Sequence, residues 1–275
     1  MEDQFVLQRV SVAYTTADGV KPIIVDLDLT IQAGELIVIV GPNGSGKSTL
    51  SHVLAGLSPI SRGTLITSGV DRDDIQVVFQ NPDAQIVGDT VYEDVCFGLE
   101  NHCIPSDEME IRVRQALSDV GLDHMIRQSV ETLSGGQKQL LCIADAIALD
   151  PKVLIFDEAT AMLDPIARDH ILHIVDTLNK RGTTILWVTQ LLNEIGHFQR
   201  ILALNDGKLI FDGTPNVFFY DRTEFGETPC AQLGLVPPYS VQVVQYLLQM
   251  GMQFDKLPIL MNSLKDVITE KCLLL

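Results

Sequence analysis

One segment constrains the fold of this 275-residue chain more than any other, because it matches the pattern G-x-x-x-x-G-K-S/T. It consists of Gly41-Pro42-Asn43-Gly44-Ser45-Gly46-Lys47-Ser48-Thr49 and follows the apolar run 36–40, which predicts a buried strand. Glycines let successive N–H groups turn inward around a phosphate, and a following helix N-terminus adds its amides. Lys47 is expected to reach the outer phosphates and Ser48 to bind Mg²⁺. A glycine-rich turn without a ligand is the alternative, and the order of strand, loop and helix favours binding.

Composition and charge narrow the class of protein. The chain has 46% apolar residues, which suffices for one substantial core and a small appended unit. Its 19 Lys and Arg against 36 Asp and Glu give a net charge of −17, which argues against nucleic acid as a partner. Five cysteines lack metal-ligand spacing and no basic-plus-apolar leader opens the chain, so we expect a reduced cytoplasmic setting. No apolar run is long enough to span a bilayer, so work at a membrane would require another polypeptide.

The first 32 residues predict an antiparallel pair of strands. Apolar and polar residues alternate over Gln4 to Val12 and over Ile23 to Ile31, with turn-like residues at 15–19 between them. Tyr14 is expected to close the first strand, where its ring could stack on a nucleotide base and contribute on the order of 1 to 3 kcal/mol. An ordinary edge-strand tyrosine is the equal alternative.

Further strands are expected at Gly63 to Thr67 and at Ile75 to Phe79. The second ends at Gln80, which could bind Mg²⁺ or hold the attacking water, since ligands gather at the carboxyl ends of strands in α/β sheets. Spacing of apolar residues then predicts a helix over 106–120, with Ser106 or Asp107 as N-cap. The polar-rich region from about residue 81 to 132 is a candidate helical subdomain.

Leu133-Ser134-Gly135-Gly136-Gln137 stands before an apolar helix expected at residues 140–149. A hydroxyl and glycine-exposed amides at a helix N-terminus could form a second anion site, or the pentapeptide could only cap the helix.

The strand expected at residues 153–156 ends in two carboxylates, Asp157 and Glu158. Asp157 suits the Mg²⁺ shell, and Glu158 suits the polarisation of an attacking water or acceptance of its proton. Burying such a pair without a cation would be costly, so a purely structural role is a poor explanation.

These motifs, in this order and with Asp164 shortly after the acidic pair, resemble the ATPase domain of ATP-binding-cassette (ABC) proteins from Gln4 to about Gly213. The resemblance implies an α/β P-loop NTPase core over residues 1–213, with an antiparallel β subdomain, a helical subdomain at about 81–150 and a helical extension at 214–275. That family dimerises head to tail, so Ser134, Gly135, Gly136 and Gln137 would contact ATP held by a partner. Asp164 would report across the same interface.

The rest of the sheet and the extension follow from local patterns. Strands are expected at 184–188, 200–203 and 209–211, with a tight turn at 205–208 before the last. Pro165 suits the first position of a helix ending near Lys180. In the extension, helices are expected at 241–250 and 264–271.

Two segments narrow the resemblance to the ATPase subunit of energy-coupling factor transporters: residues 79–100 and the tail motif Leu-Gly-Leu-Val-Pro-Pro at 233–238. Such transporters import vitamins or transition-metal ions, with two ATPases beneath a transmembrane coupling protein and a membrane substrate-capture protein. The resemblance therefore implies a peripheral protein on the cytoplasmic face of the cell membrane. It places the coupling protein near Gln80 and residues 81–132, and ATPase contacts in the tail. Leu140 and Asp145 depart from the family pattern.

A further departure from the family pattern lies at a position that takes part in hydrolysis. Gln190 stands where the family has a switch histidine after the threonine that ends a strand. It donates an N–H but carries no positive charge, so we expect slow hydrolysis at this chain's own site. The alternatives are that Gln190 substitutes adequately or that a neighbour acts. A nucleotide-gated subunit that hardly hydrolyses ATP is therefore one alternative function. An ABC protein of DNA repair or translation is another, although the chain has neither a long heptad insertion nor basic patches.

Overall fold

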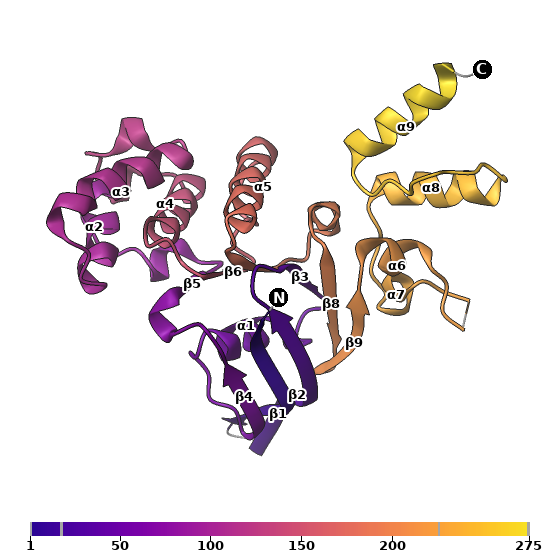
Figure 1. Cartoon of the computed structure of the whole chain (residues 1–275), viewed down its shortest axis with the longest axis horizontal. Coiled ribbons are helices and arrows are strands. Elements are labelled where there is room, and N and C mark those ends of the chain that lie inside the picture. Colours follow the sequence, from indigo (N-terminus) through magenta and orange to yellow (C-terminus); the bar gives the residue numbers. More distant parts are fainter. Residues whose placement is uncertain (1, 17–18, 225, 274–275) are drawn as a thin grey trace.

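The computed structural model describes residues 2–16, 19–224 and 226–273, which form two sheets with helices around them (Figure 1). In this part of the chain the larger sheet has six strands in the order β5-β6-β7-β3-β8-β9. All neighbours pair in parallel except β8 and β9, whose antiparallel pairing confirms the hairpin expected at 205–208. The strands are β3 (Leu36–Val40), β5 (Ile75–Val78), β6 (Val153–Asp157), β7 (Thr184–Val188), β8 (Arg200–Asn205) and β9 (Lys208–Gly213).

The central strands β3, β6 and β7 are buried on both faces, as near-continuous apolar strands of a parallel sheet are. Successive side chains point to opposite faces, so Val38, Phe156 and Trp187 join one core cluster. Ile39 and Ile155 join a second cluster on the other face. The sheet thus lies between two hydrophobic layers.

A three-stranded sheet with the order β2-β1-β4 supplies the second layer together with helix α1 (Lys47–Leu54). Its strands are β1 (Asp3–Thr16), β2 (Gly19–Gln32) and β4 (Arg62–Thr67). The antiparallel pairing of β1 with β2 confirms the prediction, while residues 17–18 of the expected turn lie outside the described residues. Tyr14 was wrongly expected to close the first strand, because the ladder continues through Thr15 and Thr16.

The first layer comes from α2 (Val91–Asn101), α3 (Ser106–Asp119), α4 (Gly135–Ala148) and α5 (Pro165–Lys180). Helices α2, α3 and α4 gather at one side of the larger sheet, beyond β5 and β6 (Figure 1). The short 3-10 segments are η1 (Arg72–Asp74), η2 (Pro82–Ala84), η3 (Asp123–Met125), η4 (Val130–Thr132) and η5 (Leu192–His197).

Two helix starts differ from the prediction. Helix α3 has Pro105 as its N-cap, so Ser106 and Asp107 already lie within the helix, and the carbonyl of Pro105 accepts from the Glu108 N–H. Helix α4 begins at Gly135 and not near residue 140. Ser134 and Gln137 cap each other's backbone in a capping box, which extends the helix through both glycines.

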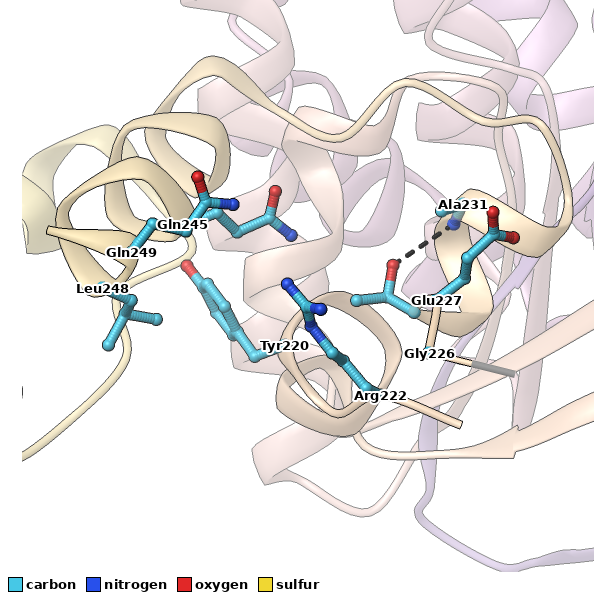
Figure 2. Close-up of a pocket in the computed structure, with 9 residues that line it drawn as sticks. Tyr220, Arg222, Gly226, Glu227, Ala231, Gln245, Leu248 and Gln249 are labelled. Carbon is cyan, nitrogen blue, oxygen red and sulfur yellow. Dashed lines mark hydrogen bonds between the residues drawn. The ribbon is translucent and has the colours of Figure 1, made fainter. Parts of the chain in front are cut away.

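The extension forms α6 (Pro215–Tyr220), α7 (Pro229–Gln232), α8 (Tyr239–Gln249) and α9 (Met261–Leu273). It lies beside β8 and β9, on the side of the sheet away from α2 to α4 (Figure 1). Phe218 and Phe219 are fully buried, so this segment is continuous with the first core cluster. A hollow of about 480 Å³ lies here. In it, Tyr220 and Arg222 point toward the helix carrying Gln245 (Figure 2).

We propose the domain division that the sequence suggested: an ATPase domain at 1–213, with the helical subdomain at about 81–150, and an extension at 214–275. No helix in the described part of the chain is both long enough and apolar enough to cross a bilayer.

Candidate nucleotide site

The carboxyl ends of four adjacent parallel strands, β5, β6, β7 and β3, lie at one edge of the larger sheet. Gln80 follows β5, Asp157 and Glu158 end or follow β6, Gln190 follows β7, and the glycine-rich loop follows β3. Segments far apart in the sequence therefore converge where ligands bind in open α/β sheets.

The loop 41–49 has the close packing and free polar groups that a phosphate site requires. A Cβ on Gly41 would lie 2.1 Å from the carbonyl oxygen of Leu204, and Gly46 has a φ of +103°, so both positions require glycine. Within the described residues the buried hydroxyl of Ser45 has no hydrogen-bond partner. Lys47 Nζ is also buried, and it donates to the carbonyls of Gly41 and Pro42 at 3.0 and 3.1 Å.

The rest of the loop is more open. Asn43, Gly44 and Ser48 are exposed and Thr49 is partly buried in α1. Burial lowers the pKa of Lys47, and the nearby carboxylates of Glu158 and Asp157 oppose that shift. In the part of the chain that the structure describes, no carboxylate forms an ion pair with this ammonium, so it is available to an anionic ligand.

Ser48 and Asp157 form the pair expected to hold Mg²⁺. Ser48 Oγ donates to Asp157 Oδ1 at 2.9 Å, and His52 Nε2 lies 3.4 Å from Asp157 Oδ2. Burial raises the pKa of Asp157, against the hydrogen bond from Ser48. One carboxylate and one hydroxyl are the hard oxygen donors with which proteins bind Mg²⁺ together with substrate phosphates, so these residues fit the ion.

Glu158 and Gln190 are in direct contact. Gln190 Nε2 donates to Glu158 Oε1 at 2.7 Å. Glu158 has a φ of +54°, in the left-handed region, and its N–H donates to the carbonyl of Val188, so the turn out of β6 is tied to the end of β7. The side chain that replaces the family's histidine therefore contacts the proposed general base.

A buried network behind Gln190 was not anticipated from the sequence. Glu194 is 2% exposed and accepts from Trp187 Nε1, Thr189 Oγ1 and Thr160 Oγ1 at 2.9, 2.8 and 3.2 Å. Arg168 Nε lies 3.2 Å from Glu194 and its guanidinium also donates to the carbonyl of Leu163. The network joins the segment before Gln190 to the loop after β6. An acidic residue shortly after an apolar strand was the only sequence signal.

The side chains of Gln80 and Tyr14 are exposed and make few contacts with the rest of the site. Gln80 is exposed and, within the described residues, its side chain has no hydrogen-bond partner. Its neighbour Phe79 is fixed instead, because its N–H donates to Gln85 Oε1 at 2.7 Å and its carbonyl accepts from Gln139. Tyr14 is 41% exposed, and its hydroxyl lies 3.4 Å from Ser58 Oγ.

The LSGGQ motif lies on a different element from the loop 41–49. Ser134 and Gly135 are exposed, and Gly136 and Gln137 are partly buried at the start of α4. Among the described residues no hydrogen bond or ion pair joins this motif to the phosphate loop or to Glu158. The backbone N–H groups of Ser134 and Gln137 are occupied by the capping box at the start of α4, so the motif lies apart from this chain's own phosphate loop.

Within one chain the site thus brings together a glycine-rich loop with a buried lysine, the hydrogen-bonded pair Ser48 and Asp157, and a second carboxylate, Glu158. This combination of fold and site defines an ATP-binding-cassette ATPase. A family model described as ABC transporter matches residues 24–161, and the chain belongs to that family.

The closer relatives agree on one kind of subunit. The chain is 35% identical over 265 residues to the energy-coupling factor transporter ATP-binding protein EcfA1 of Halalkalibacterium halodurans, covering 93% of each chain. It is 40% identical over 240 residues to the protein of the same name in Bacillus subtilis, covering 84% of each.

Solved structures give the same result. A TM-score of 0.69 with 32% identity relates the chain to cbiO1 of Clostridium perfringens, part of the ABC transporter complex cbiONQ, over 78% of this chain and 90% of that one. A dimeric ATP-binding cassette bound to ADP and Pi also matches at 0.69 and 27% identity, over 76% of this chain and 98% of that one.

Proposed function

We propose that this chain is the ATP-hydrolysing subunit of an energy-coupling factor importer for vitamins or transition-metal ions. One observation carries the proposal: the four strand ends place the phosphate loop, Asp157 and Glu158 at one edge of the sheet in a chain whose relatives are such subunits. ATP is the substrate, and Mg²⁺ would be held by Ser48 and Asp157, with Gln80 as a third ligand. The bound ion would neutralise charge on the phosphates.

The chain's own residues have distinct roles in hydrolysis. Lys47 and the loop amides would bind the phosphates, and Glu158 would accept the proton of the attacking water. Tyr14 would stack on the base. Ser134 to Gln137 would complete the site of a second ABC ATPase in a head-to-tail dimer, and Asp164 would contact the same partner.

A groove on the helical subdomain fits a membrane partner. It has a volume of about 590 Å³ and is lined by Val87, Tyr92, Phe97 and Met109, of which Val87 is 63% and Phe97 45% exposed. Carboxylates of Asp89, Glu93 and Glu100 also line it. Exposed apolar residues with an acidic rim fit an amphipathic segment carrying basic residues, so we assign the groove to cytoplasmic helices of a transmembrane coupling protein.

With this docking mode the chain would be a peripheral protein on the cytoplasmic face of the cell membrane. A membrane substrate-capture protein would select the cargo, while the extension at 214–275 would contact the second ATPase. Exposed Tyr239, Tyr246 and Met250 on or beside α8 support an interaction surface there.

The second candidate function is a nucleotide-gated subunit whose own site hydrolyses slowly. The observation that favours it is the 2.7 Å contact between Gln190 and Glu158. An amide donor on the carboxylate oxygen competes with the water that this oxygen would bind, and glutamine adds no positive charge near the phosphates. ATP binding and dimer closure would survive, and the partner ATPase, completed by Ser134 to Gln137, would turn over faster.

Co-purification in mild detergent tests the transport function. We compare the wild-type chain with Phe97→Asp in the groove and with Ile66→Asp on β4, because the two native side chains are 45% and 46% exposed. We expect integral membrane proteins to accompany wild type and Ile66→Asp but not Phe97→Asp. Equal recovery with all three chains, or no membrane protein with wild type, would contradict the docking mode.

A further inference from the structure

In the helical subdomain, two buried carboxyl oxygens have no hydrogen-bond donor among the described residues. Asp94 lies in the first turn of α2 and is 5% exposed, and Asp145 lies in the third turn of α4. Asp94 Oδ2 and Asp145 Oδ1 are both buried and both lack a hydrogen-bond donor. The two carboxyl groups are neighbours, because α2 packs on α4, and burial and then the Asp94 carboxyl raise the pKa of Asp145. Two carboxylates cannot hydrogen-bond to each other, because neither has a proton to donate.

The other carboxyl oxygen of Asp94 binds the backbone of the loop before α2. Asp94 Oδ1 accepts from the backbone N–H groups of Val87 and Gly88, at 2.8 and 2.7 Å. A Cβ on Gly88 would lie 2.4 Å from the Asp94 nitrogen, so the loop lies directly against α2. Val87 and Gly88 also line the groove. Asp94 therefore fixes the loop that forms one wall of that groove.

We propose that Asp94 and Asp145 share one proton, and that Asp145 is thereby a positioning residue that ties α4 to the groove loop at Val87 and Gly88. The Asp145 hydroxyl donates to Asp94 Oδ2, which satisfies both orphaned oxygens with a single hydrogen. Asp94 stays a carboxylate toward the two backbone amides, which favours short, charge-assisted hydrogen bonds. Helix α4 begins at the LSGGQ motif and carries Asp145 ten residues beyond Gly135, so the shared proton ties this helix to the groove loop.

The surroundings favour a proton over any other partner. Burial, and then the charge of Asp94, raise the pKa of Asp145. Cys142 on α4 lies near both carboxyls, and its third acidic neighbour, Asp83 of η2, is already paired with Lys138 at 2.6 Å. Among the described residues no Lys, Arg or His pairs with either carboxyl, and no group of three or more His, Cys, Asp or Glu could hold a metal ion.

The stabilising contribution of the shared proton depends on pH in a defined direction. Asp145 binds its proton more tightly in the folded chain than in the unfolded chain, so its contribution is present at low pH and is lost as pH rises through the folded pKa. Above that point two ionised carboxylates in contact repel each other, and the hold on Val87 and Gly88 weakens. Asp145→Asn removes this dependence, because its amide N–H donates to Asp94 at every pH.

Infrared spectroscopy of the isolated chain tests the proton directly. We expect the carbonyl band of a protonated carboxylic acid at pH 7 in wild type and in Asp150→Asn, and its loss in Asp145→Asn. Asp150 is the matched control, since it is an exposed acid just beyond the same helix. Absence of the band from wild type, or its persistence in Asp145→Asn, would overturn the proposal.

Amide hydrogen exchange at Val87 and Gly88 tests the positioning role. We expect exchange to be at least about tenfold faster in Asp145→Ala than in wild type, because Asp94 then keeps an unpaired buried oxygen, and within about twofold of wild type in Asp145→Asn. Should the alanine variant not fold, the pH dependence of exchange in wild type and in Asp145→Asn gives the answer. Raising the pH should accelerate these two amides more in wild type than in Asp145→Asn, after correction for base-catalysed exchange.

Equal pH dependence in wild type and Asp145→Asn would refute the positioning role. Only the identity of the groove's occupant rests on the proposed function. Both experiments use the chain without membrane partners, so a wrong docking partner would leave their outcomes unchanged.

Discussion

Replacing Gln190 by histidine restores the side chain that the family uses at the end of β7. In the wild-type chain Gln190 Nε2 donates to Glu158 Oε1 at 2.7 Å, so its single well-placed donor is directed to the general base and not to a phosphate. An imidazole has two ring nitrogens and gains a positive charge on protonation, so Gln190→His offers a cationic donor to charge that develops in the transition state.

The size of the effect follows from the role of such donors. A missing transition-state donor costs about 10² to 10³ in rate, or about 2.7 to 4 kcal/mol. Gln190 retains some capacity to donate, so we expect Gln190→His to raise single-turnover hydrolysis at this chain's site by at least about tenfold, which is about 1.4 kcal/mol.

The assay uses the reconstituted complex, with ATP turnover and transport both measured. Gln190→Ala is the control. We expect it to change turnover by no more than about threefold, because Gln190 itself stabilises the transition state only weakly. Glu158→Gln added to Gln190→His should abolish the gain, since the proton acceptor is then absent. If neither turnover nor transport rises by more than about twofold in Gln190→His, the impaired-site hypothesis fails.

Three further variants test the rest of the site. Lys47→Ala should weaken both ATP binding and turnover, because the buried ammonium supplies the phosphate counter-charge, and unchanged affinity in calorimetry would refute the assigned phosphate site. Glu158→Gln should retain ATP binding and accumulate ATP-bound dimers, and a site that keeps most of its single-turnover activity would remove Glu158 from catalysis. Arg168→Ala should lower the free energy of unfolding by about 3 kcal/mol, since Glu194 is then buried without its cation. Lys180→Ala, which breaks an exposed pair on the same helix, should cost less than about 1 kcal/mol in the same denaturant titration.

Local patterns predicted the strands well. The runs at 36–40, 153–156 and 184–188 form the central strands, because a strand buried on both faces must be apolar throughout. In the extension, α8 and α9 overlap the helices expected at 241–250 and 264–271, whereas α6 and α7 were not expected. Helix starts were harder, since α4 depends on the reciprocal caps of Ser134 and Gln137, whereas the apolar pattern begins five residues later.

The site was predicted in part. Motif spacing identified the phosphate loop and the acidic pair, because each depends on consecutive residues. Glu194 lies in a network with Thr160 and Arg168, and such long-range contacts have no local pattern. Asp145 was noted as a departure from the family, yet its partner Asp94 lies 51 positions earlier in the sequence, and only the packing of α2 on α4 brings them together.

Photo-crosslinking from the groove tests most directly the claim that this chain drives a membrane transporter. A photoreactive residue at Val87, which is 63% exposed, is compared with one at Val20 on β2, which is 72% exposed. In native membranes we predict crosslinks from position 87 to an integral membrane protein, abolished by Phe97→Asp, and none from position 20. Crosslinks from position 87 that reach only soluble proteins would contradict the account.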